Sequence, residues 1–267
     1  MNDFLMTTLG GVVGGLSVKA FSGPLKTLED AWFLAVGHKF ENTKSKLQAK
    51  IDADYERLKY DMLKNIHHTP ADRIKDPNMQ IVGPALEAAK YSISNETLRQ
   101  MFAKLISSSM DTDKNEIIHP AFVDVLKQLS PFDAQVLQAI YNGNEAVAKI
   151  LFGTDNHSFK EMATNVYIDE SLPNNDHKLT SSSLDNLNRL GIINIDYNQN
   201  LSDLSQYDPI KESITYQKLK LTLEALKDID GFSVYTSIEF RKGICRLTQF
   251  GQDFSFICLD SDGDYSS

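Results

Sequence analysis

The stretch MQIVGPALEAAKYSISNETLRQMFAKLISSSMDTDKNEIIHPAFVDVLKQLSP, residues 79–131, decides the fold that this sequence predicts. It contains three predicted helices, each preceded by residues that commonly start one. Pro84 and Pro120 open the first and third, because proline is tolerated in a first helical turn, and Ser94 and Asn95 supply side-chain oxygens that can cap the second. The second helix repeats apolar residues every three or four positions, on one face: Leu98, Met101, Phe102, Leu105 and Ile106. We therefore expect a packed helical core, with a further helix starting at Pro131.

A long amphipathic helix is predicted upstream of this core. Between Leu25 and Ile66 the apolar side chains recur mostly four and seven residues apart, with Gly37 as a candidate interruption. The helix is expected to end at His67 and His68. Adjacent histidines cannot face one side of a helix, and no third ligand lies at a suitable spacing, so the pair favours a surface turn over a metal site.

The N-terminal stretch FLMTTLGGVVGGLSV, residues 4–18, carries no charge. Its glycines give two overlapping GxxxG spacings: Gly10, Gly11, Gly14 and Gly15. This spacing lets helices approach closely in lipid, which makes the four glycines candidates for membrane or helix contact. The stretch is shorter than the roughly 18–20 residues that span a bilayer, and each glycine weakens an isolated helix by about 1 kcal/mol. Burial against the helical domain, membrane contact and disorder are three open alternatives.

The pattern changes from Pro131 onward. The predicted elements follow the order of a winged helix: a helix over 132–140, a short helix over 158–166, a capped helix over 180–190, a strand over 192–197, a strand over 232–240, a turn over 241–243, a strand over 244–247 and a helix capped by Thr248. Residues 144–153 fit a strand or a short helix, and residues 199–231 fit both states as well. The residues after Asp260 form an acidic tail for which we expect disorder.

The charge of the chain is unevenly distributed. Of its net charge of −9, residues 1–130 contribute nothing, with 16 Lys and Arg and 16 Asp and Glu, whereas residues 131–267 hold 11 and 20. Double-stranded DNA requires cations on the binding face, because each phosphate contact releases counterions. An acidic C-terminal half therefore makes nucleic acid a disfavoured partner. The candidates for such contact are few: Arg189, Arg241, Lys242 and Arg246.

The two cysteines, Cys245 and Cys258, are too few for a disulfide framework and lack metal-site spacing, so we expect reduced core residues. No catalytic, cofactor-binding or metal-ligating residues are predicted, because the acids and histidines form no cluster of the required spacing. A basic segment of the kind that begins a secretion signal is not evident, which leads us to expect a cytoplasmic protein, with membrane association as an alternative.

Three segments together resemble the abortive-infection alpha family, otherwise described as a domain of unknown function. They are GPLKTLEDAWFLAVGHKF, IVGPALEAAKYSISNETLRQMFAKLISSSMD and IHPAFVDVLKQLSPFDAQVL. The resemblance covers roughly residues 20–258, including LTQFGQDF near the end. It implies a bacterial or phage-borne cytoplasmic protein connected with phage exclusion, and it supplies no catalytic residues. The chain departs from the family in its glycine-spaced N-terminus and in residues 199–231.

We therefore predict a mainly α protein in which an N-terminal helical domain precedes a winged-helix-like α+β domain. The predicted parts are a lead segment over 1–23, a helical domain over 24–130, the winged-helix-like domain over 131–259 and a tail over 260–267. The predicted function is non-enzymatic phage defence through a protein partner, self-association or a membrane surface, without a cofactor. The alternatives are a winged-helix DNA-binding regulator and, with less support, a nuclease or other hydrolase.

Overall fold

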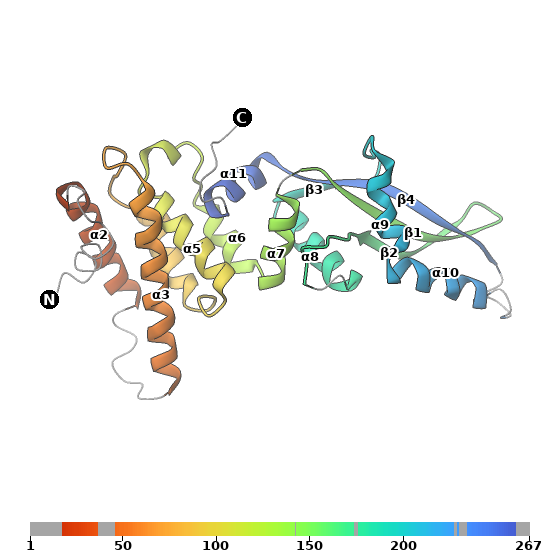
Figure 1. Ribbon diagram of the computed structural model, residues 1–267, viewed down its shortest axis with the longest axis horizontal. Coiled ribbons are helices and arrows are strands. Elements are labelled where there is room, and N and C mark those ends of the chain that lie inside the picture. The colour runs from red at the N-terminus through yellow and green to blue at the C-terminus, as the bar shows by residue number, and fades with distance from the viewer. Residues whose placement is uncertain are drawn as a thin grey trace. The chain divides into compact units, whose positions relative to one another are not determined.

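A computed structural model describes residues 18–36, 46–141, 143–173, 176–226, 229 and 234–259 (Figure 1). The chain divides into two compact units. The described residues up to Pro131 and those from Asp253 form the helical unit, and Phe132–Gln252 form the sheet unit. Residues 253–259 thus belong with the helical unit, whereas the predicted second domain ran over residues 131–259. The four candidate glycines of the lead segment and the acidic tail lie outside the described residues.

The helical unit contains five α-helices and a short 3-10 helix before α7, among the described residues: α2 (Val18–Val36), α3 (Lys46–His68), α4 (Met79–Ala89), α5 (Glu96–Ser108), η2 (Thr112–Lys114) and α6 (Ala121–Gln128). The predicted caps of the central stretch are confirmed at Asn95, which accepts a hydrogen bond from the backbone N–H of Leu98 at 3.1 Å, and at Pro120, the N-cap of α6. The face predicted for α5 is buried, with Phe102 at 0% exposure.

The predicted start of α4 at Pro84 is wrong. The helix begins at Met79, where the side chain of Asn78 accepts from the N–H of Gln80, and Pro84 lies inside it. A residue with a Cβ is disfavoured in helical conformation before proline. Gly83 relieves this restriction, because it has no Cβ, and this explains why the helix continues through Pro84.

The sheet unit combines a four-stranded antiparallel sheet with short helices. Its elements are α7 (Pro131–Ile140), β1 (Glu145–Thr154), β2 (Phe159–Val166), α8 (His177–Arg189), β3 (Ile193–Asp196), η3 (Leu204–Tyr207), α9 (Asp208–Glu212), α10 (Ile214–Leu226) and β4 (Tyr235–Leu247), with α11 (Gln249–Cys258) leading back to the helical unit. The strand order is β2-β1-β4-β3. Predictions confirmed here include the helix over 180–190, the strand at IINIDY and the cap at Thr248, whose Oγ1 accepts from the N–H of Gly251 at 2.9 Å.

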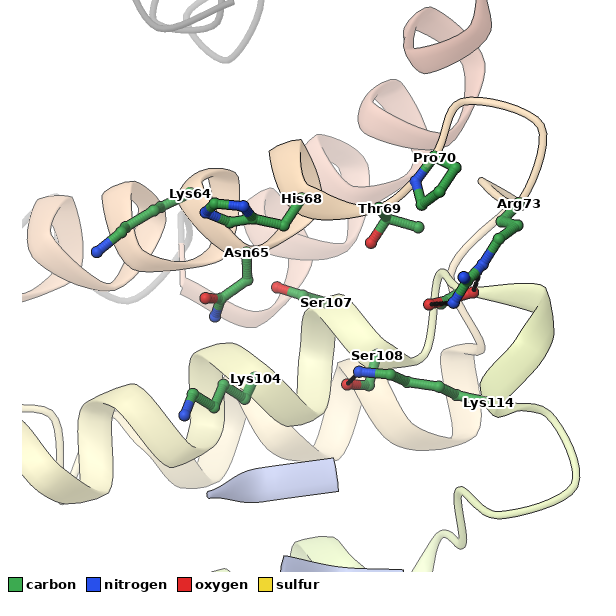
Figure 2. A pocket seen from close by; sticks show the side chains of 11 residues that line it. Lys64, Asn65, His68, Thr69, Pro70, Arg73, Lys104, Ser107, Ser108 and Lys114 are labelled. Carbon is green, nitrogen blue, oxygen red and sulfur yellow. Dashed lines mark hydrogen bonds and ion pairs between the residues drawn. The ribbon is translucent and has the colours of Figure 1, made fainter. Parts of the chain in front are cut away.

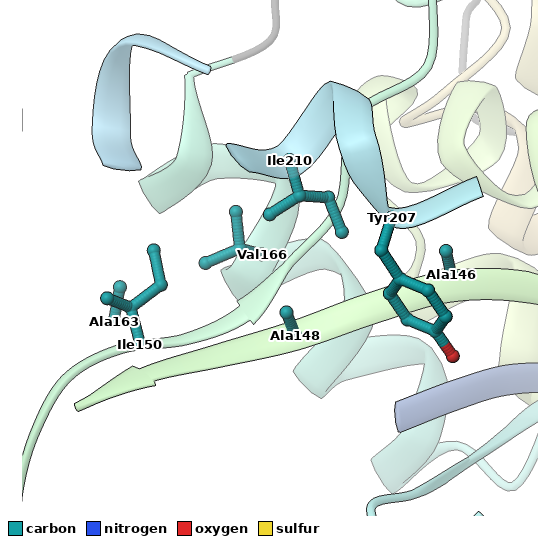
Figure 3. Close-up of a cluster of buried hydrophobic side chains, with 7 residues drawn as sticks. All are labelled: Ala146, Ala148, Ile150, Ala163, Val166, Tyr207 and Ile210. Carbon is teal, nitrogen blue, oxygen red and sulfur yellow. The ribbon is translucent and has the colours of Figure 1, made fainter. Parts of the chain in front are cut away.

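The short helix predicted over 158–166 is wrong, because this segment is strand β2. Its apolar residues have helical spacing, yet β2 pairs with β1 in antiparallel register, with Ile150 opposite Ala163. Ala163 and Val166 are buried in a cluster on one face of the sheet, together with residues of β1, η3 and α9 (Figure 3). The undecided residues 199–231 supply this cover: their described part forms η3, α9 and α10.

The turn predicted at residues 241–243 is also wrong. Strand β4 runs through this segment, where Arg241, Lys242 and Gly243 pair with β1 residues. Gly243 has another role, because a Cβ there would lie 2.6 Å from the ring of Tyr197. The glycine thus permits close packing of an aromatic ring on a strand. The fold is mainly α with a four-stranded antiparallel sheet.

Candidate functional site

A polar pocket of about 490 Å³ lies in the helical unit, between the last turns of α3 and α5 (Figure 2). Its lining comes from α3, from the connection that follows it, from α5 and from the segment after α5: Lys64, Asn65, His68, Thr69, Pro70, Arg73, Lys104, Ser107, Ser108, Asp111 and Lys114. The volume falls in the range of small-molecule sites, about 300–1,000 Å³. The lining is unusual for such a site because it is mostly polar.

The two helices that bound the pocket are joined by specific polar contacts. Arg99 of α5 pairs with Asp61 of α3, with 2.8 Å between Nε and Oδ2. The hydroxyl of Ser107 lies 3.1 Å from the carbonyl oxygen of Met62 and 2.7 Å from that of Ala103. A hydroxyl has one proton, so the donation is shared between these acceptors. These contacts fix the spacing of α3 and α5 and therefore the width of the pocket.

An ion pair closes one end of the pocket. Arg73 donates to both carboxylate oxygens of Asp111, at 3.0 Å from Nε and 2.6 Å from Nη2, and also approaches Asp113 at 3.1 Å. The hydrogen bond to Asp111 is the main reason why the pKa of Arg73 is raised. Asp111 is 3% exposed, and it also accepts from the N–H of Asp113. A two-point pair of this kind orients both groups, so Arg73 serves the architecture of the pocket.

The lysines bring positive charge to the pocket from different elements. Lys104 of α5 donates to the carbonyl oxygen of Leu259. Lys114 donates to the hydroxyl of Ser108 at 3.1 Å, and its ammonium group lies 5.5 Å from the ring centroid of Phe256. With Lys64 and Arg73 the lining holds four Lys or Arg side chains against one carboxylate, that of Asp111. The pocket is therefore suited to an anion.

The contact between Ser108 and Lys114 also invites comparison with catalytic Ser–Lys pairs. In such pairs the lysine must be neutral to take the proton of the serine. Lys114 lies near the C-terminal end of α5 and beside the ring of Phe256, and both surroundings favour the charged ammonium. With a charged Lys114, the hydroxyl of Ser108 is the acceptor of this hydrogen bond.

The nucleic-acid candidates occupy separate places in the sheet unit. Successive side chains of a strand point to opposite faces, so Arg241 and Lys242 of β4 face opposite ways. Lys242 lies 5.7 Å from the ring centroid of Tyr207, on the covered face of the sheet. Arg246 is exposed and pairs with Asn194 of β3, and Arg189 of α8 donates to the side chain of Asn186 at 2.7 Å.

Both cysteines are buried and free of disulfides, as the sequence predicts. Burial raises the pKa of Cys245 to about 12 and also raises that of Cys258.

Within the described ranges, no three His, Cys, Asp or Glu side chains come together as a group able to hold a metal ion. None of the helices described has the length and apolar character needed to cross a bilayer.

Sequence reasoning missed every residue of the pocket as a functional candidate. His68 was interpreted as part of a surface turn, whereas it lines the pocket next to the end of α3. One signal was available: Lys64 and His68 are four residues apart, as are Lys104 and Ser108, so each pair shares a helix face. Only the packing of α3 against α5 brings the two faces together.

The family model described as "Abortive infection alpha" matches residues 48–258 of the chain, which include all of the pocket. Among curated proteins, none matches. A solved structure of an uncharacterized protein from the marine bacterium Alcanivorax borkumensis SK2 is similar over 55% of this chain and 94% of its own, with 11% sequence identity and a TM-score of 0.34.

Proposed function

The chain belongs to the abortive infection alpha family, and we propose that it acts in phage defence by binding an anionic ligand in the basic pocket of its helical unit. The family name connects the chain with abortive infection, and the ligand is our proposal. The observation that carries it is the lining of the pocket, with four basic side chains against one carboxylate in a chain of net charge −9. A cleft lined by one sign of charge concentrates ions of the other sign.

In this proposal the ligand is the signal, and the effect follows from contacts with a protein partner or a second copy of the chain. A membrane surface is the further candidate, and the cytoplasm is the proposed location. Phe33 and Leu34 of α2 support a contact role, because both are large apolar side chains that are more than half exposed. Exposed apolar side chains that lie together commonly mark interaction sites.

We propose binding without catalysis. The support is the surroundings of Lys114, because the C-terminal end of α5 and the ring of Phe256 favour a charged ammonium, which cannot take the proton of Ser108. Ser108→Ala removes the hydroxyl but leaves all four basic side chains, so phage protection should stay within about tenfold of the wild type, as expected for the loss of one hydrogen bond of about 0.5–1.5 kcal/mol. Complete loss of protection in a folded Ser108→Ala variant would instead indicate a hydrolase.

A winged-helix DNA-binding regulator is the weaker alternative. The order helix, strand, helix and strand around α8 and β3 supports it, but Arg241 and Lys242 face opposite sides of β4. A duplex needs cations on one face. We expect no mobility shift of duplex DNA at moderate salt. A shift that disappears when Arg241, Lys242 and Arg246 all become Glu would favour this alternative.

The central experiment measures plating of phage on bacteria that express the chain or its variants. Lys64→Glu combined with Lys104→Glu reverses the charge of the pocket from both bounding helices, and should abolish protection. The matched control combines Lys26→Glu with Lys127→Glu, which makes the same change in net charge at exposed helix positions outside the pocket. Protection that survives in the pocket variant, at equal protein levels, would contradict the proposed function.

A further inference from the structure

The pocket offers charge along its length and almost nothing that holds an aromatic ring. From these features we propose that its ligand is a compact, base-free anion with several phosphate groups, such as a short polyphosphate chain. This inference rests on the proposed function, because it names the ligand class of the same pocket. Three features of the pocket support this ligand class: the few apolar groups in its lining, the placement of its cations and the rigidity of its frame.

The lining lacks a platform for a nucleobase. Proteins hold bases by stacking them on aromatic rings or on the flat face of arginine. Within the described lining, Pro70 is the apolar residue and His68 the aromatic one. His68 is exposed, and its ring already lies against that of His67, with centroids 5.8 Å apart. The guanidinium group of Arg73 is held by Asp111 and Asp113. A nucleotide would therefore find contacts for its phosphates but few for its base.

The cations are spread along the pocket. Figure 2 shows Lys64 and Lys104 on facing helices, with both amino groups extending toward the same side of the view. Lys114 reaches Ser108 farther along, and the Arg73–Asp111 ion pair, whose charges offset each other, frames the opposite end. The three lysines therefore stand at separate points of the lining, so a chain of phosphates can contact all of them where a single phosphate contacts only some.

Neutral hydrogen-bond donors fill the space between the charges. The amide of Asn65 lies between α3 and α5 in Figure 2. The hydroxyl of Thr69, the residue directly after α3, also lines the pocket. Amide and hydroxyl groups donate to phosphate oxygens as lysines do, though without charge. The frame that carries these groups is held by the Arg73–Asp111 and Arg99–Asp61 pairs, so the site exists before the ligand arrives. Such pre-organisation reduces the entropic cost of binding.

The inference is tested by calorimetric titration of the full chain with tripolyphosphate, inorganic phosphate and ATP at matched ionic strength. We expect tripolyphosphate to bind at least about tenfold more tightly than inorganic phosphate, and ATP to bind no more tightly than tripolyphosphate. Affinity should fall as NaCl rises from about 50 to about 200 mM, because the contacts are electrostatic. Equal affinity for phosphate and tripolyphosphate, tighter binding of ATP by about tenfold, or no binding of any of them would each overturn the inference.

Variants locate the binding. Lys64→Ala combined with Lys104→Ala should weaken tripolyphosphate binding by about tenfold or more, and Lys26→Ala combined with Lys127→Ala should leave it unchanged. Thermal unfolding of each variant shows whether it is folded. The titrations of the wild-type chain test the inference even if a variant fails to fold. If the Lys64→Glu, Lys104→Glu variant loses phage protection but the wild-type chain does not bind tripolyphosphate, the ligand class is rejected and the proposed function is kept. Full protection by that variant would reject the proposed function, whatever the titrations show.

Discussion

The helical unit and the sheet unit use their polar side chains in different ways. In the helical unit most buried side chains are apolar, Arg99–Asp61 and Ser107 link α3 to α5, and further polar groups line the pocket beside them. In the sheet unit, buried polar side chains bond to other side chains and to the backbone: Asp133 accepts from Ser183 at 2.6 Å, and the hydroxyl of Tyr207 donates to the carbonyl of Gly243 at 2.9 Å. Buried polar groups with such partners stabilise one arrangement of the fold, and they are not available to bind a ligand. Polar groups at a cavity can act on a ligand, which is why we place function in the helical unit.

This contrast predicts that the apolar interior dominates the stability of the helical unit. Phe102 of α5 has 0% exposure, and Phe102→Ala should cost about 3–5 kcal/mol through lost burial and the cavity it leaves. That is a large part of a typical total of about 5–15 kcal/mol. Urea denaturation followed by circular dichroism measures the change. Tyr91→Ala is the control, because Tyr91 is 80% exposed. A normal unfolding curve for Phe102→Ala would show that the helical core is not the main source of stability.

The sheet unit should be most sensitive at a close backbone contact. A Cβ at Gly251 would lie 1.9 Å from the carbonyl oxygen of Ile192 and 2.8 Å from its carbon. Backbone atoms cannot rotate away, and the same oxygen accepts from the N–H of Thr248 at 3.0 Å. Gly251→Ala should therefore cost about 3 kcal/mol through overpacking. The free energy of unfolding from urea titration tests this, and a cost below about 1 kcal/mol would mean that the first turn of α11 moves easily away from the backbone of Ile192.

The polar frame of the pocket should have an intermediate effect. Asp111→Ala removes both hydrogen bonds to Arg73 and should cost about 1.5–3 kcal/mol, the range for hydrogen bonds to charged groups. Asp111→Asn keeps an acceptor for the N–H of Asp113 and should lose less. Thermal unfolding of both variants at neutral pH provides the comparison. An equal loss of stability in the two variants would show that the ion pair with Arg73 stabilises the fold, and that the hydrogen bond from the N–H of Asp113 does not.

The smallest predicted effect concerns Glu145 in the sheet unit. Burial, aided by the negative charge of Asp169, raises the pKa of Glu145. In the folded chain the ionised form is therefore disfavoured, so this group lowers stability as pH rises through the window above the ordinary pKa of glutamate. Glu145→Gln should raise the melting temperature at neutral pH by a small amount and flatten its dependence on pH from about 4 to 7. A melting temperature lowered at neutral pH would mean that the carboxylate has a favourable partner.

Part of the fold could be predicted from short segments of the sequence. The caps at Asn95 and Thr248, and the face that buries Phe102, depend on residues within one or two helical turns. Such signals survive in any environment, because the hydrogen bonds and the spacing belong to the segment itself. The family was also evident from local segments, and the match over residues 48–258 bears it out.

Other features arise only when distant segments meet. Residues 159–166 have helical spacing, but pairing with β1 makes them a strand, and the same partner keeps β4 extended through Gly243. Cross-strand contacts outweigh local preference in such cases. The pocket has the same origin, since Lys64 and Lys104 lie on separate helices. The sequence by itself determined helices such as α5 and α8, the caps at Asn95 and Thr248 and the family, because these depend on near neighbours. Tertiary structure decided the sheet and the basic pocket, because each needs side chains that only packing brings together.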